Sequence, residues 1–420
     1  MGFASTYLEK SAIFNEFIKE APDKKTGIIV VVPAYNEPGI STLLYSLASC
    51  DEPQCSVEVI IVVNAPANAE EDSLENNKNT LKNIEIWKQE NSSCFFRLYA
   101  FDPGGQSLSD WGVGLARKTG MDEAVRRFNY INNSGGVILN LDADCLVEKN
   151  YFVSVYNELL INRYRSACSI YFEHPLSGKD FPDYVYENIT LYELHLRYYF
   201  QGLAYSGFPF VFHTVGSAFA VKSHQYIKAG GMNRKQAGED FYFIQKLVPE
   251  GGYFSLNSTT VYPSPRSSSR VPFGTGATMQ KLSAGNLSTL LTYNMLAFKE
   301  LRSFFCMTGN IFDSRNEDLH DCYELIPDSL KLFLEEKMWI DKMVEIKNNT
   351  SALPSFKKRF FGWFNMFRIV KYLNWVHQEI FEKKPVNISS SELLESNGII
   401  FRSKDPLNLL LYFRQMEKKI

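Results

Sequence analysis

The sequence predicts an α/β fold, in which helices wrap a mostly parallel β-sheet and a helical C-terminal lobe follows. Short apolar runs alternate with amphipathic segments in the first part of the chain. Each run is apolar on both faces, which is typical of strands that helices cover on both sides of a parallel sheet. Beyond about residue 287 glycine nearly vanishes and helical periodicity dominates.

The predicted strands of the first half each end at polar residues. The strands are residues 27–33, 57–63, 94–100 and 136–141, and helices are expected within residues 40–49 and 108–128 and after the polar stretch 67–79. A short leading helix is expected in the first 25 residues. Ligands of such sheets bind beyond the carboxyl ends of the strands. The candidates there are Tyr35, Asn36, Glu37, Asn64, Asp102, Asp142 and Asp144.

The later part of the chain is less regular. We expect strands at residues 166–172 and 216–221, helices at 184–201 and 239–247, and a loop at 262–276 that is rich in Pro, Ser, Arg and Gly. Helical segments are expected at residues 287–304, 329–347, 360–381 and 407–419. The predicted organisation is an extension (1–25), a first half of the sheet region (26–145), a second half (146–280) and a helical region (281–420).

Composition excludes several classes of protein. The 420 residues exceed one compact core, and a net charge of -3 argues against a nucleic-acid partner. The seven cysteines are scattered without a Cys-x-x-Cys pair, which indicates neither a zinc site nor a disulfide framework and favours a reducing cytoplasm. We expect no signal peptide and no membrane span. The aromatic and basic residues 356–375 leave peripheral contact with the inner face of a membrane open.

The pair Asp142 and Asp144 is the main chemical signal. It ends a buried strand, and two carboxylates separated by one residue suit a hard cation shared with phosphate oxygens. An Asp-x-Asp pair alone is as well explained by a turn or a helix N-cap. Its place after a strand in this alternating pattern favours the functional interpretation.

Other motifs each have a functional and a plain interpretation. Residues 32–37 end the first strand, where they would hold a base and ribose or simply form a turn. Residues 112–120 open a helix with glycines, and Arg117 and Lys118 there suit phosphate. These glycines do not match a dinucleotide-binding fingerprint, because residues 102–111 separate them from the preceding strand. Glu239 and Asp240 begin a predicted helix, where a carboxylate serves either as a general base or as an N-terminal acid that favours the helix dipole.

Taken in order, these motifs resemble the family 2 glycosyltransferases of the GT-A fold, which is Rossmann-like. The resemblance covers roughly residues 26–276, and it implies that residues 26–145 bind the nucleotide-sugar and that residues 146–280 bind the acceptor. It is carried by Pro33-Ala34-Tyr35-Asn36-Glu37, Gly114-Leu115-Ala116-Arg117, Asp142-Ala143-Asp144, Gly216-Ser217-Ala218-Phe219-Ala220 and Gly238-Glu239-Asp240.

The resemblance implies an inverting, non-processive transfer from a UDP- or GDP-sugar to a sugar, lipid-linked or small-molecule acceptor. The general base would be Asp240, with Glu239 as its substitute, and Mn²⁺ or Mg²⁺ would bind at Asp144 and Asp142. The nucleotide-sugar side would comprise Pro33, Ala34, Tyr35, Glu37, Asn64, Arg117, Asp142, Ala143, Gly216 and Ser217.

This sequence departs from the family pattern after the base motif. Many relatives have a metal-binding histidine there, but only His320 and His377 follow Asp240, both in the helical region. Instead the loop 263–276 carries Arg266 and Arg270, which we expect to clamp the diphosphate as a lid. A solvated loop is the plain alternative. The Gln-x-x-Arg-Trp motif of processive synthases is absent.

Other classes of function remain as alternatives. A catalytically silent nucleotide-sugar-binding or scaffold protein would have no need of Asp142, Asp144 and Asp240 together. A nucleotidyltransferase usually has a glycine-rich basic loop after its first strand, where this chain has Ala34-Tyr35-Asn36-Glu37. Both alternatives are therefore disfavoured.

Overall fold

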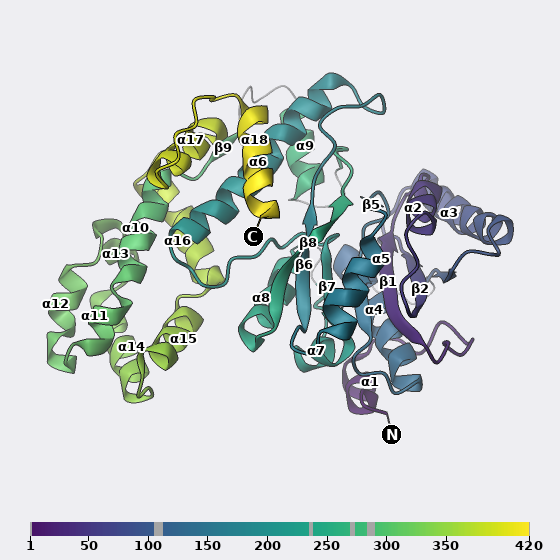
Figure 1. Cartoon of the computed structure of the whole chain (residues 1–420), viewed down its shortest axis with the longest axis horizontal. Coiled ribbons are helices and arrows are strands. Elements are labelled where there is room, and N and C mark those ends of the chain that lie inside the picture. Colours follow the sequence, from purple (N-terminus) through teal and green to yellow (C-terminus); the bar gives the residue numbers. More distant parts are fainter. Residues whose placement is uncertain (1, 105–111, 235–237, 269–273, 284–289, 420) are drawn as a thin grey trace. The chain divides into compact units, whose positions relative to one another are not determined.

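The computed structural model describes residues 2–104, 112–234, 238–268, 274–283 and 290–419. The chain divides into two compact units. The sheet unit comprises Met1–Tyr186, Phe212–Gln280 and Glu417–Ile420. The helical unit comprises Glu187–Val211 and Lys281–Met416. Most elements of both are labelled in Figure 1.

The sheet unit is built on an eight-stranded sheet in the order β3-β2-β1-β4-β7-β6-β8-β5. Neighbours pair in parallel except at β4–β7, β7–β6 and β8–β5, so the predicted α/β class with a mostly parallel sheet is confirmed. β1 is buried at every residue, as its apolar, β-branched sequence predicts. The strands are β1 (Thr26–Ala34), β2 (Ser56–Val63), β3 (Phe96–Phe101), β4 (Val137–Asn140), β5 (Leu146–Val147), β6 (Ala167–Phe172), β7 (Phe219–Lys222) and β8 (Tyr253–Tyr262).

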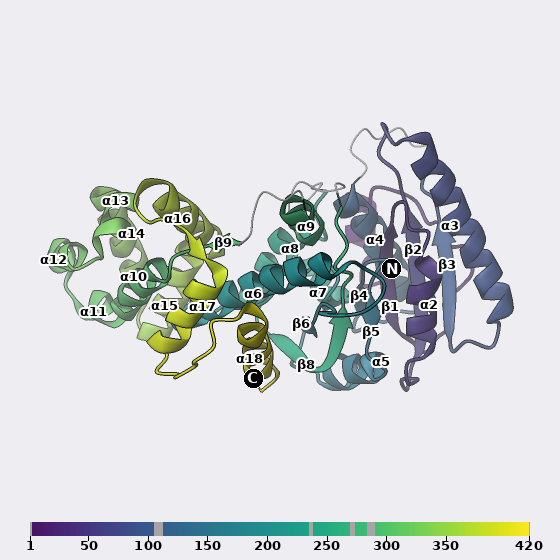
Figure 2. The ribbon, with the colours of Figure 1, turned by 90° about the horizontal axis from the view of Figure 1, so that it is seen from above.

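Helices cover this sheet, and one of them, α4, carries Arg117, which belongs to the site described below. α4 packs against β1 and β2, and Figure 2 shows it beside these strands. A Cβ at Gly120 of α4 would lie 2.5 Å from Val31 Cγ1, so only glycine permits this approach. The helices are α1 (Ser5–Ser11), α2 (Ile40–Ala48), α3 (Glu71–Glu90), α4 (Val113–Tyr130), α5 (Tyr151–Val155, then a π-helical turn, Tyr156–Ile161), α7 (Ser223–Lys228), α8 (Glu239–Leu247, then a 3-10 turn, Val248–Glu250) and α9 (Thr275–Ser283).

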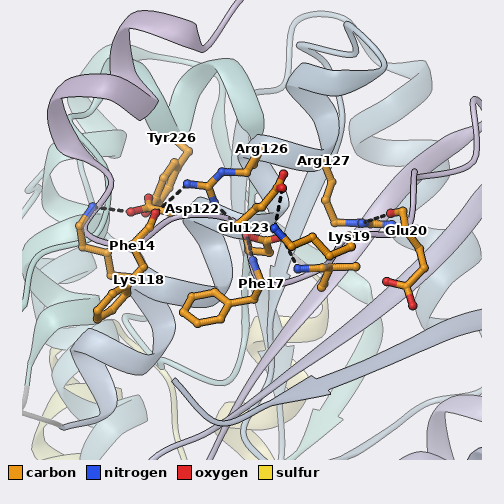
Figure 3. Close-up of polar contacts among 12 residues, drawn as sticks. Phe14, Phe17, Lys19, Glu20, Lys118, Asp122, Glu123, Arg126, Arg127 and Tyr226 are labelled. Atoms are coloured by element: carbon orange, nitrogen blue, oxygen red, sulfur yellow. Dashed lines mark hydrogen bonds and ion pairs between the residues drawn. The ribbon is translucent and has the colours of Figure 1, made fainter. Parts of the chain in front are cut away.

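The N-terminal extension is fastened to α4 by charged side chains of that helix (Figure 3). Arg126 donates to the carbonyl oxygen of Phe14 and Arg127 to that of Glu20, both at 2.8 Å. Glu123 accepts hydrogen bonds from the backbone N–H groups of Phe17 and Ile18. Together with the packing of Phe14 against Leu115 and the stacking of Phe17 on Phe101, these contacts fix the extension on α4 and β3.

Lys118 of α4 is buried, contrary to our expectation that it would meet phosphate. Its ammonium pairs with Asp122 at 2.9 Å, one turn along the helix. Tyr7 and Tyr226 both donate to Asp122 Oδ1 at 2.8 Å. Lys118 therefore joins α1, α4 and α7, and has no part in the site described below.

The helical unit contains most of α6 (Asp183–Tyr205) and the segments that follow residue 290. Its charged centre is Glu193, fully buried, which accepts from Arg197 and Arg414 at 2.6–2.8 Å. None of the helices in the described part of the chain has the length and apolar character of a membrane span. The elements are α10 (Met295–Cys306), α11 (Thr308–Asp313), a 3-10 turn (Asn316–Asp318), α12 (Leu319–Glu324), α13 (Asp328–Phe333), α14 (Glu336–Asn348), α15 (Leu353–Trp363), α16 (Met366–Glu379), α17 (Val386–Ser396), α18 (Pro406–Lys418) and the two-stranded pair β9 (Leu291–Thr292) and β10 (Lys384–Pro385).

Several predicted elements differ from the observed ones. β8 was missed, because its sequence YFSLNSTTVY is polar and follows two glycines. Residues 329–347 and 360–381 are each divided between two helices, since Leu334 and Phe364 leave helical geometry. Hydrophobic periodicity continues through such breaks, so it overestimates helix length.

Candidate active site

The carboxyl ends of β1 and β4 bring two acidic motifs together. The strands are neighbours with Val31 opposite Asn140, and the N–H of Leu141 still donates to Val31 O at 3.2 Å. Glu37 follows β1, and Asp142 and Asp144 follow β4. The expectation that these acidic residues meet at one edge of the sheet is consistent with this register.

Asn36 turns the chain between β1 and Glu37. Its φ of 54° lies in the left-handed region, which asparagine adopts more readily than most residues with a side chain. Its N–H donates to Asn77 Oδ1 and its side-chain oxygen accepts from Asn76 Nδ2, both at 2.8 Å. Asn77 also donates to the carbonyl oxygen of Asn64 at 2.9 Å. The amides of α3 thus fix the ends of β1 and β2 together.

Arg117, in the first turns of α4, joins the β4 end to the start of α8. Its Nη2 donates to Asp142 Oδ1 at 2.5 Å, and its Nη1 donates to Glu239. Burial alone lowers the pKa of this guanidinium, but the carboxylates of Asp142, Glu239 and Asp240 raise it above its ordinary value. Arg117 is therefore a fixed positive charge within an acidic cluster.

Gly216 makes room for that guanidinium. A Cβ on Gly216 would lie 2.7 Å from Arg117 Nη2 and 2.8 Å from its Cζ. The adjacent Ser217 is buried and its side chain contacts the Cys145 thiol, next to Asp144. These two residues therefore shape the site from the segment before β7.

Arg266 lies in the segment that follows β8 and bridges the other two acidic residues. Its Nε contacts Asp144 Oδ2 at 2.7 Å, and its Nη2 donates to Glu37. Burial lowers the pKa of Arg266, whereas Asp144 and Glu37 raise it, and the net direction is upward. A single guanidinium thus holds together the ends of β1 and β4.

Glu239 and Asp240 form the first turn of α8, as the sequence predicts. Gly238 precedes them at φ 71°, a conformation that glycine adopts without strain. Burial raises the pKa of Glu239 to about 7, against the effect of Arg117. Burial also raises the pKa of Asp240, against Arg117 and the N–H of Phe241, which donates to Asp240 Oδ1 at 2.7 Å. Raised pKa values suit groups that exchange protons near neutral pH.

The charges of this cluster do not balance, since more carboxylates than guanidinium groups take part. The side chains of Asp142 and Asp144 are 37% and 25% exposed. No group of three potential ligands is found among the described residues. A hard cation bound by one or two carboxylates completes its coordination with water and phosphate oxygens. The donor set therefore fits Mg²⁺ or Mn²⁺ together with a phosphate-bearing ligand. The cluster consists of Glu37, Asp142, Asp144, Glu239 and Asp240 with Arg117 and Arg266.

The other predicted site residues either lie near this cluster or fall outside the residues that the structure describes. Pro33 and Ala34 are the buried end of β1, Tyr35 follows them, and Ala143 is buried between the two aspartates. Arg270 falls outside the described residues. Sequence reasoning did not single out Asn76 and Asn77, although a run of amides in the helix after β2 was a visible signal. His213, just before Gly216, has its Nε2 3.0 Å from Glu417 Oε2.

No protein-family model and no curated protein sequence matches the chain. Solved structures resemble it at 14% identity. S. aureus TarS 1–349 in complex with UDP-GlcNAc covers 79% of this chain and 89% of its own, with a TM-score of 0.41. The mannosyltransferase PcManGT from Pyrobaculum calidifontis, in complex with GDP-Man and Mn²⁺, covers 99% and 93%, with a TM-score of 0.36. Glucosyl-3-phosphoglycerate synthase from Mycobacterium tuberculosis covers 64% and 84%, with a TM-score of 0.34. Likeness at these values assigns no activity to this chain.

Proposed function

We propose that this protein is an inverting glycosyltransferase that moves a sugar from a nucleoside-diphosphate sugar to an acceptor hydroxyl. The observation that carries the proposal is the cluster in which Asp142 and Asp144 meet Arg117 and Arg266, beside Asp240. Acidic residues for a cation, arginines for phosphate and a carboxylate with a raised pKa are the groups that this reaction needs.

The donor would lie across the carboxyl ends of β1, β2 and β4. The turn after Ala34 and the end of β2 at Asn64 are held in place by hydrogen bonds to each other and to Asn77, and would border the base and ribose. Arg117 and Arg266 are the cations that can meet the diphosphate. Gly216 and Ser217 would border the sugar and the acceptor.

Asp142 and Asp144 would hold Mg²⁺ or Mn²⁺, with phosphate oxygens and water completing the coordination. The cation supplies neutralisation of the negative charge that collects on the leaving diphosphate. Arg117 opposes the mutual repulsion of the acidic residues by pairing with Asp142 and Glu239.

Asp240 would accept the proton of the acceptor hydroxyl. The hydroxyl oxygen then forms a bond to the anomeric carbon on the face opposite the diphosphate, and the bond from that carbon to the phosphate oxygen breaks. The electron pair leaves with the nucleoside diphosphate, so the configuration inverts. Glu239 is held by Arg117, which leaves Asp240 as the preferred base.

The test is a screen of UDP- and GDP-sugars with Mn²⁺, which reads release of the nucleoside diphosphate by the full chain. We expect release with one donor class, loss of release in Asp144→Asn together with the metal-dependent rise in melting temperature, and donor binding without turnover in Asp240→Asn. Binding without turnover in the unchanged protein would instead indicate a silent nucleotide-sugar-binding protein. No binding of any nucleotide contradicts the proposal.

A further inference from the structure

Arg266 engages one acidic residue after β1, Glu37, and one after β4, Asp144. Its Nε contacts Asp144 at 2.7 Å while its Nη2 contacts Glu37. The two carboxylates are far apart in the sequence, and Arg266 comes from a third segment, after β8. A guanidinium is suited to such a bridge, because its N–H groups are fixed in one plane and point in different directions.

Asp144 is also the main carboxylate proposed to bind the divalent cation. A guanidinium and a cation are both attracted to the same carboxylate, and the two positive charges repel each other, so Arg266 in contact with Asp144 Oδ2 competes with a cation for Asp144. Glu37 is nearly buried, with a side chain 7% exposed, so it holds Arg266 in place from the protein side. In this structure, the positive charge next to Asp144 is the guanidinium of Arg266.

A diphosphate offers Arg266 a different partner. Phosphate oxygens accept paired N–H donors from arginine as carboxylates do. The backbone beside Arg266 need not move for this exchange: Pro265 restricts it, the N–H of Arg266 donates to Ser264 Oγ at 3.4 Å, and the N–H of Ser268 donates to Gly276 O at 3.1 Å. The side chain is 28% exposed and its flexible stem provides the reach.

We infer that Arg266 is a tethered counter-ion of the cation site, which makes the binding of divalent cation and of diphosphate depend on each other. Without a diphosphate, Arg266 offsets part of the negative charge of Asp144 and Glu37 and weakens the binding of free cation. With a diphosphate, Arg266 moves onto the phosphate oxygens and Asp144 turns to the cation. This inference rests on the proposed function and adds a specificity: the site selects cation and diphosphate together over either one alone.

The test measures Mn²⁺ binding to the full chain by electron paramagnetic resonance, with and without UDP or GDP. In Arg266→Gln we expect free Mn²⁺ to bind about tenfold more tightly, the factor that one charge-assisted contact represents. The nucleoside diphosphate should bind more weakly in the same variant, so the coupling between the two ligands falls. The opposite signs of these changes separate the inference from a general loss of structure.

Two further variants separate direct contact from long-range electrostatics. Arg266→Lys retains the charge but has no planar fork to span Glu37 and Asp144, so we expect it to behave like Arg266→Gln. Arg234 is exposed, and Arg234→Gln should behave like the unchanged protein. Coupling that is equal in Arg266→Gln and in the unchanged protein overturns the inference. Absence of any Mn²⁺ and diphosphate binding in the unchanged protein counts against the proposed function instead.

Discussion

Gly216→Ala tests whether the position of Arg117 depends on the missing side chain at Gly216. The new Cβ would lie 2.7 Å from Arg117 Nη2 and 2.8 Å from Cζ, whereas ordinary contact begins at 3.4 Å. Gly216 has no left-handed backbone conformation, so the substitution acts through space and not through backbone strain.

The expected loss of stability and of diphosphate affinity follows from how far the Arg117 guanidinium must move. For Nη2 alone the guanidinium must move by 3.4 − 2.7, about 0.7 Å, to restore ordinary contact, and Nη1 lies closer still, so the whole displacement is larger than this. Movement along the Arg117–Asp142 hydrogen bond, now 2.5 Å, would therefore lengthen it to at least about 3.2 Å, the outer limit for such a bond. Overpacking of this kind costs about 1–3 kcal/mol of the free energy of unfolding. Weakening one charged hydrogen bond should reduce diphosphate affinity about tenfold.

The assay combines urea unfolding with calorimetric titration of UDP or GDP in the presence of Mn²⁺. The matched control is Gly362→Ala in α15, where a Cβ meets nothing within 4 Å. Because alanine favours helix over glycine by about 1 kcal/mol, this control should be neutral or slightly stabilising. If Gly216→Ala leaves both the free energy of unfolding and the diphosphate affinity unchanged, the guanidinium of Arg117 does not pack against Gly216.

Two more predictions concern buried charge. Glu239 has a folded pKa of about 7 against a lower unfolded value, so between these values the folded chain retains a proton that the unfolded chain releases. The free energy of unfolding should therefore fall as the pH rises through this window, and urea unfolding at several pH values should show a smaller slope for Glu239→Gln; equal slopes would contradict the assignment. In the helical unit, Glu193→Gln leaves Arg197 and Arg414 without their buried carboxylate and should cost about 3–5 kcal/mol, measured by thermal unfolding; an unchanged melting temperature would contradict this role of Glu193.

The sheet and its acidic edge were largely predictable from local pattern. The apolar runs at β1, β2 and β4 are continuous and β-branched, and each strand lies where it was predicted within a few residues. The start of α8 at Glu239 was predictable from the acidic first turn. β8 was not, because its serines, threonine pair and asparagine lack both the apolar run and the clean alternation that indicate strands.

In the candidate site, too, some residues were predictable from the sequence and others were not. Asp142, Asp144 and Asp240 were identified as candidates because each follows a strand or begins a helix, which is a property of the neighbouring sequence. The burial of Lys118 against Asp122 was not foreseen, although Lys118 is adjacent to Arg117. Successive helix residues point about 100° apart, so one faces the acidic cluster while the next faces α1 and α7.

The residues that carry charge at the carboxyl edge of the parallel sheet can therefore be identified from local sequence pattern. Their pairing becomes visible only in the folded chain: Arg117 pairs with Glu239, and Arg266 pairs with Glu37 and Asp144. The reason is the distance along the sequence over which each kind of information acts. Periodicity reports which way a side chain faces within its own element, whereas an ion pair requires two elements, distant in sequence, to bring two side chains within about 3 Å of each other.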